Sequence, residues 1–217
     1  ADTKSLGFNF ISAGSRTTFS TGKATIEAAR AVIQTCRERA AAHWDIPVEA
    51  VVWEEGQARP ASSNAGDFDP LTLKDLAAMA PKQGGPISGH IETNVAGAAP
   101  SYAAQSVDVE VDPETGQVKI LRFTVAQDAG KAIHPSYVEG QFQGATAQGI
   151  GWALNEEYIY DKNGCLENPN FLDYRIPVAS DLPMIDTVII EVPNPAHPYG
   201  VRGIGETSII PVMAAVA

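Results

Sequence analysis

A carboxylate at the end of a glycine turn is the feature of this sequence best suited to chemistry. Glu206 follows Gly203-Ile204-Gly205, and the apolar run behind it predicts the start of a buried helix with Pro211 in its first turn. Glycines let a ligand approach the backbone closely, and a carboxylate placed there is suited to act as a general base. A helix N-cap is the commoner role for such a glutamate, since the helix dipole favours an anion there by roughly 0.3–1 kcal/mol. These residues alone do not decide between a general base and a helix cap.

A loop rich in small hydroxyl residues is a second candidate site. Residues 9–22 contain Gly14-Ser15-Arg16-Thr17-Thr18, whose hydroxyls, backbone N–H groups and guanidinium suit an anion such as a phosphate. The clearest helical pattern, residues 24–43, follows directly, and a helix N-terminus strengthens an anion site. A polar surface loop is the commoner use of such a composition, and the lysine of a nucleotide-binding P-loop is missing.

Composition excludes several classes of function. The formal net charge of −11 over 217 residues argues against a nucleic-acid-binding protein, which needs a basic face. No apolar run approaches the ~20 residues of a membrane span. Two cysteines, Cys36 and Cys165, are too few for an iron–sulfur cluster, which takes about four thiolates. The four histidines lack metal-ligand spacing, so we expect no metal ion bound by side chains.

Hydrophobic periodicity and turn residues predict an α+β fold. Beyond the helix over 24–43, we expect a strand over 48–53, a loop from there to residue 69, and a helix over 71–80 that is started by Thr72. We also expect a hairpin over 105–126 with its turn at residues 112–116, a hairpin from 157–160 that turns at 163–164, and a strand over 187–192. Strands and helices do not alternate regularly, which argues against a parallel α/β sheet. A helix is also expected after the capping-box pattern Ser136-x-x-Glu139.

That last helix contains an unusual number of glycines. They are Gly140, Gly144, Gly149 and Gly151. Each costs about 1 kcal/mol relative to alanine in a helix interior. We therefore expect close packing against another backbone, or a bulky ligand, to offset the loss.

Taken together, these segments resemble the molybdenum-binding subunit of the molybdenum hydroxylases, the family of xanthine dehydrogenase and the aldehyde oxidoreductases. The matching segments, in family order, are 14–22 with the helix behind it, 128–130, 139–151, 173–183 and 203–206. The family's catalytic subunit is much longer. The resemblance therefore implies that residues 1–217 are its C-terminal molybdenum-cofactor-binding domain, with two subdomains at about 1–95 and 96–217, and that the N-terminal part is absent.

The resemblance implies roles for individual residues. Glu206 matches the family's catalytic base in a hydroxylation that takes its oxygen from water and acts on an aldehyde or an N-heterocycle. The residues matched to cofactor binding are Gly14, Ser15, Arg16, Thr17, Thr18, Gln148 and Gly205. Molybdenum is held by the pterin dithiolene, so no residue ligates it. Arg16 suits the extra phosphate of the cytosine dinucleotide form of molybdopterin.

The resemblance also implies partners. We expect an N-terminal molybdenum domain or subunit, an iron–sulfur subunit and an FAD subunit on other chains or domains, with a small-molecule substrate and a cytoplasmic location. The alternative is a non-catalytic module that holds the cofactor or assists assembly. The Gly-x-Gly-Glu206 context favours catalysis, because such a module has little need of a carboxylate there. A plain nucleotide-phosphate-binding domain rests only on the Ser/Thr loop.

Overall fold

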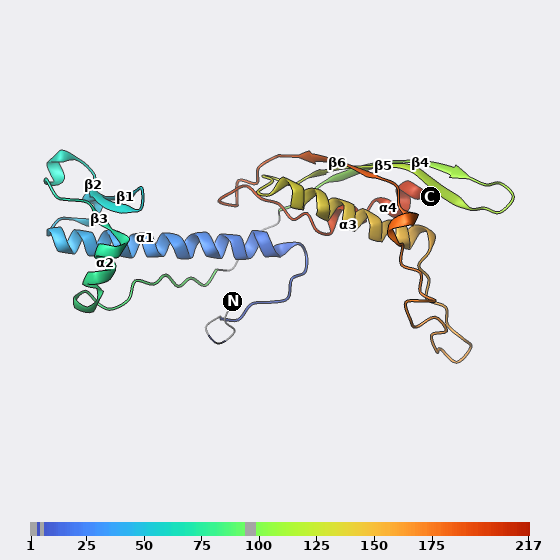
Figure 1. Cartoon of the computed structure of the whole chain (residues 1–217), viewed down its shortest axis with the longest axis horizontal. Coiled ribbons are helices and arrows are strands. Elements are labelled where there is room, and N and C mark those ends of the chain that lie inside the picture. The colour runs from blue at the N-terminus through green and yellow to red at the C-terminus, as the bar shows by residue number, and fades with distance from the viewer. Residues whose placement is uncertain (1–3, 5–6, 94–98) are drawn as a thin grey trace. The chain divides into compact units, whose positions relative to one another are not determined.

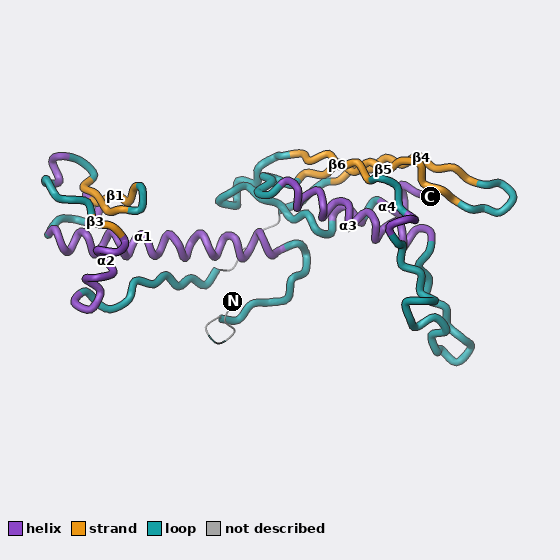
Figure 2. The backbone as a smooth tube through the Cα atoms, viewed as in Figure 1, coloured by secondary structure: helices purple, strands orange, loops and turns teal. Residues whose placement is uncertain are grey.

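The computed structural model describes residue 4, residues 7–93 and residues 99–217. Its internal contacts divide the chain into two compact units, one of residues 20–95 and one of residues 1–19 and 96–217. Figure 1 shows the helices and strands of each unit, and Figure 2 separates helix, strand and loop by colour. The interpretation of the whole chain as one cofactor-binding domain stays a prediction.

The unit of residues 20–95 is built on one long helix. Helix α1 (Gly22–Trp44) packs with α2 (Leu73–Met79) and a small antiparallel sheet of β1 (Val51–Glu54), β2 (Gln57–Pro60) and β3 (Leu71–Thr72). Its core is small and apolar, with Cys36, Ala40, Trp44, Val51, Ala58 and Leu76 buried. Burial raises the pKa of the Cys36 thiol above its ordinary value, which keeps it protonated.

Local chemistry explains how two of these elements begin. Thr72 caps α2 as predicted, since its hydroxyl accepts the N–H of Asp75, and the Asp75 carboxylate accepts the N–H of Thr72 in return. Strand β2 corrects the sequence prediction, which gives a loop at these residues. Glu55 and Gly56 turn the chain tightly between β1 and β2 with φ of 51° and 76°. A Glu-Gly pair is a weaker hairpin signal than Asn-Gly or Asp-Gly.

The second unit places a helix on a three-stranded mixed sheet. The sheet order is β4 (Ala103–Val111), β5 (Val118–Asp128) and β6 (Ile185–Ile190), with β4 antiparallel and β6 parallel to the central β5. Helix α3 (Pro135–Leu154) packs against β5 and β6, and the short α4 (Val212–Val216) packs against α3 and β4. The core includes Phe123, Val125, Phe142, Ile150, Ile185 and Val212. The α+β prediction is confirmed.

Helix α3 shows how its glycines are accommodated. A Cβ at Gly149 would lie 2.5 Å from Cβ of Val212 in α4, and one at Gly151 would lie 2.6 Å from Cδ of Pro177. These two glycines therefore allow close packing. A Cβ at Gly140 or Gly144 would meet nothing within 4 Å.

Three predicted boundaries in this unit are wrong. Helix α3 begins at Pro135, so Ser136 lies inside the first turn, and its hydroxyl contacts His134 Nδ1 at 3.2 Å instead of capping the helix. The hairpin that begins at residue 157 turns at Asn163-Gly164 as predicted, but its return runs on to Glu167, and a single bridge, Tyr160 to Leu166, takes the place of paired strands. Strand β6 spans residues 185–190, two residues earlier than expected, because the register with β5 begins at Ile185.

Candidate functional site

The predicted glycine turn and the predicted Ser/Thr loop lie against each other. The backbone N–H of Gly14 donates to Oε1 of Glu206 at 3.0 Å. In return, the Ser15 hydroxyl oxygen accepts the N–H groups of Gly205 at 2.9 Å and Glu206 at 3.2 Å. Two segments from opposite ends of the chain are thus joined by three hydrogen bonds around one carboxylate.

Two glycines make this approach possible. A Cβ at Gly203 would lie 2.8 Å from Cβ of Ser15, which is too close for any other residue. Gly14 adopts a left-handed backbone with φ of 64°, and Ser15 follows with φ of 56°, which is uncommon for a residue other than glycine. These two left-handed residues turn the chain, so that the N–H of Gly14 and the hydroxyl of Ser15 both contact the glycine turn over 203–206.

The side chain of Glu206 does not cap a helix. Glu206 precedes the short 3₁₀ turn Thr207–Ile209 as its N-terminal boundary residue, but its carboxylate makes no capping hydrogen bond there. The carboxylate instead accepts the Gly14 N–H, and the residue is exposed. Of the two carboxylate oxygens of Glu206, only Oε1 has a hydrogen-bond donor among the described residues, so Oε2 is open to a proton.

The Ser/Thr segment is more helical than predicted. Thr17–Thr21 forms a π-helical turn that runs directly into α1, so Thr17 and Thr18 lie in the first turn of a helix instead of in a loop. The first N–H groups of a helix have no partner within it and can bind an anion. The prediction of a helix start at residue 24 is therefore wrong, whereas the predicted pairing of hydroxyl residues with a helix start is retained.

A buried histidine holds the end of this turn. The N–H of Tyr199 donates to Nδ1 of His197 at 3.2 Å, so the ring carries its proton on Nε2, which donates to the carbonyl of Phe19 at 3.0 Å. The rings of Phe19 and His197 pack with centroids 5.0 Å apart. His197 thereby connects the loop before the glycine turn to the π-helical turn.

The glycine turn is also held by the end of β5. Arg202 N donates to the Ala129 carbonyl at 3.1 Å, and the Arg202 guanidinium forms a largely buried ion pair with Asp128 at 3.0 Å. Gly130, with φ of 65°, passes so close to the partner segment that a Cβ would lie 2.2 Å from the Gly200 carbonyl oxygen. The segment Asp128-Ala129-Gly130 therefore supports the turn that carries Glu206.

These segments enclose a cavity of about 870 Å³. Its lining includes Ser15, Arg16, Thr17, Thr18, Gly205 and Glu206, together with Lys131, Gln141 and Arg202. Three of these side chains are cationic and one is a carboxylate, in a chain whose formal net charge is −11. Lys131 is paired with Glu191 at 2.8 Å and Arg202 with Asp128, whereas Arg16 lies over the ring of Phe10. The cavity is therefore suited to an anionic ligand.

One predicted cofactor residue lies elsewhere. Gln148 borders a smaller cavity of about 360 Å³ with Glu156 and Pro177. It is two turns of α3, or about 10 Å along the axis, from Gln141, which does line the larger cavity. Sequence reasoning overlooked Gln141 as a site residue, although it stands in the matched segment over 139–151. It also overlooked Lys131 and Arg202, which carry no recognisable spacing.

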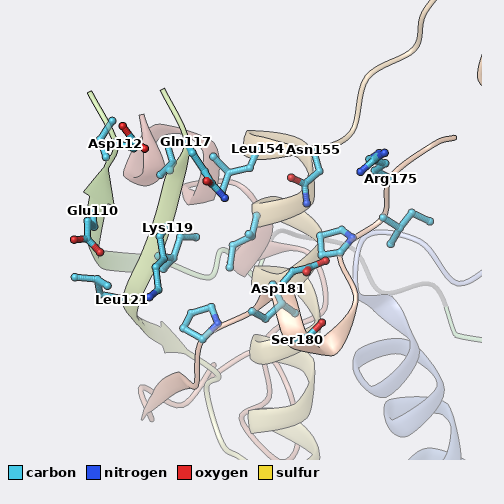
Figure 3. Close-up of a pocket in the computed structure, with 18 of the residues that line it drawn as sticks. Glu110, Asp112, Gln117, Lys119, Leu121, Leu154, Asn155, Arg175, Ser180 and Asp181 are labelled. Atoms are coloured by element: carbon cyan, nitrogen blue, oxygen red, sulfur yellow. The ribbon is translucent and has the colours of Figure 1, made fainter. Parts of the chain in front are cut away.

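A larger cleft of about 1530 Å³ contains none of the predicted site residues. It lies between the β4–β5 turn, the C-terminal end of α3 and the loop over 171–184 (Figure 3). Its polar lining mixes charges of both signs, with Glu110, Asp112 and Asp181 beside Lys119 and Arg175. Size alone therefore does not select the site; the convergence of the two predicted loops does.

Comparison with known proteins decides the family. A family model described as the molybdopterin cofactor-binding domain matches residues 1–183. The chain belongs to this family. The resemblance to the molybdenum hydroxylases is thereby confirmed, although the match ends before the turn that carries Glu206. Among the described residues no group of three or more His, Cys, Asp or Glu side chains is placed to hold a metal ion, and no helix is long and apolar enough to cross a membrane.

Relatives of this molybdopterin cofactor-binding domain include whole subunits of bacterial dehydrogenases. The xanthine dehydrogenase molybdenum-binding subunit of Escherichia coli O157:H7 is 39% identical over 150 residues, which cover 67% of the chain and 20% of the relative. The 6-hydroxypseudooxynicotine dehydrogenase complex subunit gamma of Paenarthrobacter nicotinovorans is 41% identical over 117 residues, or 54% of the chain and 15% of the relative. The chain thus matches about a fifth or less of these relatives' length.

Solved structures share the fold. Quinoline 2-oxidoreductase from Pseudomonas putida 86 has a TM-score of 0.80 at 27% identity, covering 98% of this chain and 28% of that one. The Cu,Mo-CO dehydrogenase in its carbon-monoxide-reduced state has a TM-score of 0.80 at 25% identity, with 98% and 27% covered. The molybdopterin cofactor-binding domain therefore has the same fold as the matching part of these enzymes.

Proposed function

We propose that this chain is part of a molybdenum hydroxylase, in which Glu206 is the general base for oxidation of an aldehyde or an N-heterocycle. One observation carries the proposal: Gly14 and Ser15 fix Glu206 at the edge of a cavity lined by cationic side chains, with its Oε2 atom open. Membership of the molybdopterin cofactor-binding family supports it. Acid–base catalysis by a positioned side chain contributes typically about 10²–10⁴-fold to a rate.

The described residues fit a molybdopterin cofactor. The cavity has room for a phosphate-bearing ligand, and Arg16 has no carboxylate partner among the described residues. The residues that would hold the cofactor are Gly14, Ser15, Arg16, Thr17, Thr18 and Gly205, whereas Gln148 borders the smaller cavity and is not among them. Arg16 would neutralise a phosphate of the cytosine dinucleotide form. When bound, the cofactor supplies the water-derived oxygen and accepts two electrons from the substrate.

The chain itself orients and moves a proton. The Gly14 N–H donates to Oε1 of Glu206. This hydrogen bond fixes the orientation of the carboxylate and leaves Oε2 to take the proton. The N–H groups of Gly205 and Glu206, held by the Ser15 hydroxyl, prevent the turn from rotating the carboxylate away. Because Glu206 is exposed, the proton can pass on to solvent after each turnover.

Other parts of the enzyme must supply what these residues do not. We propose that an N-terminal molybdenum domain or subunit completes the cavity, and that electrons leave through iron–sulfur and FAD centres on other chains or domains of a cytoplasmic complex. Cys36 is buried and Cys165 is exposed, both are free thiols, and two thiols are too few to hold an iron–sulfur cluster.

Metal and nucleotide analysis of the natively purified assembly tests the proposal. Wild-type protein and Glu206→Gln are compared for molybdenum per chain, for CMP released by acid, and for turnover of xanthine, quinoline or benzaldehyde with an artificial electron acceptor. We expect both proteins to contain molybdenum and CMP, and only the wild type to oxidise a probe substrate. Molybdenum with full turnover in the variant would reject Glu206 as the base. Molybdenum without turnover in either protein would favour the non-catalytic cofactor-holding module.

A further inference from the structure

A buried glutamine beneath the Glu206 turn has a role that the proposed function does not use. Gln127 lies at the end of the central strand β5 and is fully buried. We propose that Gln127 is a positioning residue that fixes the backbone on both sides of Glu206. The proposal rests on Glu206 as the general base, and concerns what holds that base in place.

The amide of Gln127 contacts both flanks of Glu206. Its Nε2 donates to the carbonyl of Ile204 at 3.4 Å, two residues before the glutamate. Its Oε1 accepts the hydroxyl hydrogen of Ser208, two residues after it. Ser208 is fully buried as well, so this contact is shielded from water. One side chain therefore connects the entry and the exit of the turn.

Neighbouring side chains hold the Gln127 amide in one orientation. The second Nε2 hydrogen donates to the Ser101 hydroxyl at 3.3 Å, and that hydroxyl donates to the Asp128 carbonyl at 2.5 Å. From β4, the Nε2 atom of Gln105 donates to the carbonyl of Ser208 at 2.5 Å. Flipping the Gln127 amide would place its NH₂ group on Ser208 and its oxygen against the Ile204 carbonyl, which is unfavourable. The network thus specifies which atom contacts which flank.

The backbone of Gln127 is held equally well. Its Cα is paired with Ala103 of β4 on one side and with Ile189 of β6 on the other. A side chain on a central strand is a rigid reference point, whereas the Ser15 hydroxyl that contacts the same turn belongs to a loop. The two supports approach from different directions, Ser15 from the loop and Gln127 from the sheet.

An amide makes this pair of contacts, whereas side chains of similar size and shape cannot. Leucine has the volume but no donor or acceptor, and glutamate accepts at both oxygens and repels the Ile204 carbonyl. Misplacing a catalytic group by about 1 Å can lower a rate about 10²-fold. Loss of the Gln127 amide should therefore lower kcat and leave cofactor binding intact, because Gln127 does not line the cavity.

The test uses the complete assembly with Gln127→Leu and a matched control, Gln143→Leu. Gln143 lies in the same unit on α3, and its Nε2 donates to the Ile185 carbonyl at 3.2 Å, away from Glu206. Three quantities are measured: molybdenum content, kcat and KM with xanthine, quinoline or benzaldehyde as the probe, and amide hydrogen exchange over residues 203–208.

We expect Gln127→Leu to retain molybdenum and KM, to lose kcat by roughly 10–100-fold, and to exchange the amides over 203–208 at least about tenfold faster. Gln143→Leu should match the wild type in all three. Unchanged exchange over 203–208 in Gln127→Leu would overturn the proposal even if no probe is turned over. A parallel loss of molybdenum and kcat would assign Gln127 a purely structural role and would also overturn it. Failure of the proposed function can be told apart from failure of this proposal, because it would appear as full turnover in Glu206→Gln.

Discussion

The backbone N–H of Gly14 donates to the Glu206 carboxylate at 3.0 Å, although 192 positions separate the two residues in the chain. The contact places the start of the Ser/Thr segment on the end of the glycine turn. Each segment alone has an ordinary interpretation, as a surface loop or as a helix cap. Their contact around one cavity is what supports a shared role in binding an anionic cofactor and moving a proton.

Ser15→Ala should loosen the Glu206 turn. The Ser15 hydroxyl accepts the N–H groups of Gly205 and Glu206, and each group left without a partner costs about 1–3 kcal/mol when buried, less here because Ser15 is only half-buried. We expect roughly tenfold slower turnover with the cofactor retained. Steady-state kinetics on protein matched for molybdenum would measure it, with the exposed Ser180→Ala as control. Equal rates for the two variants would show that Ser15 does not position Glu206.

His197→Phe should release the π-helical turn. Phenylalanine keeps the packing against Phe19 but removes the donor to the Phe19 carbonyl and the acceptor for the Tyr199 N–H. We expect a loss of about 1–3 kcal/mol in the free energy of unfolding and faster amide exchange over residues 14–19. His197→Gln, which can both donate and accept, should recover part of the loss. The solvent-exposed His90→Phe provides the control and should leave both quantities unchanged.

Two glycines of α3 should respond to alanine with opposite signs. Gly149→Ala places a methyl group 2.5 Å from Cβ of Val212 and should destabilise the protein by about 1–3 kcal/mol. Gly144→Ala meets nothing within 4 Å and should stabilise it by about 0.4–1 kcal/mol, because the unfolded chain loses freedom. Denaturant titration measures both. Destabilisation by Gly144→Ala would mean that this face of α3 packs against something in the assembly.

Alkaline stability should depend on Tyr174. Its hydroxyl donates to Glu156 at 2.8 Å, and this hydrogen bond raises the pKa of Tyr174 from 10.0 to about 12. The folded state therefore holds the proton more tightly than the unfolded state, so the stabilisation is complete below pH 10 and is lost as pH rises from about 10 to about 12. Tyr174→Phe should remove this part of the pH dependence, as measured by unfolding at several pH values. The control Tyr160→Phe, which changes an exposed tyrosine, should leave this part of the pH dependence unchanged.

Local signals in the sequence were enough for much of the fold. The long periodic stripe predicted α1, the Thr72 cap predicted α2, and the Asp112–Gly116 turn predicted the β4–β5 hairpin. The errors arose where tertiary contacts decide. Parallel pairing with β5 sets the limits of β6, and Pro135 begins α3 before Ser136 can cap it. The π-helical turn over 17–21 is held by His197, a contact that no local pattern indicates.

Some residues of the candidate site could be predicted one by one, but their arrangement could not. Ser15, Arg16 and Glu206 were recognisable from residue type and from the family resemblance. Their mutual contacts depend on the close approach at Gly203 and on support from Asp128 and Arg202, which a single sequence does not show. Gln127 illustrates the limit, because a glutamine at the end of a strand is unremarkable until its burial and its partners are known.

The rate of the first half-reaction tests the central claim most directly. Stopped-flow reduction of the molybdenum-loaded assembly by its substrate isolates the step in which Glu206 takes the proton, free of later electron transfer. We predict that Glu206→Gln slows this step by about 10²-fold or more, while Glu139→Gln, an exposed glutamate of α3 outside the cavity, reduces at the wild-type rate. Reduction of Glu206→Gln at the wild-type rate would contradict the assignment of Glu206 as the general base.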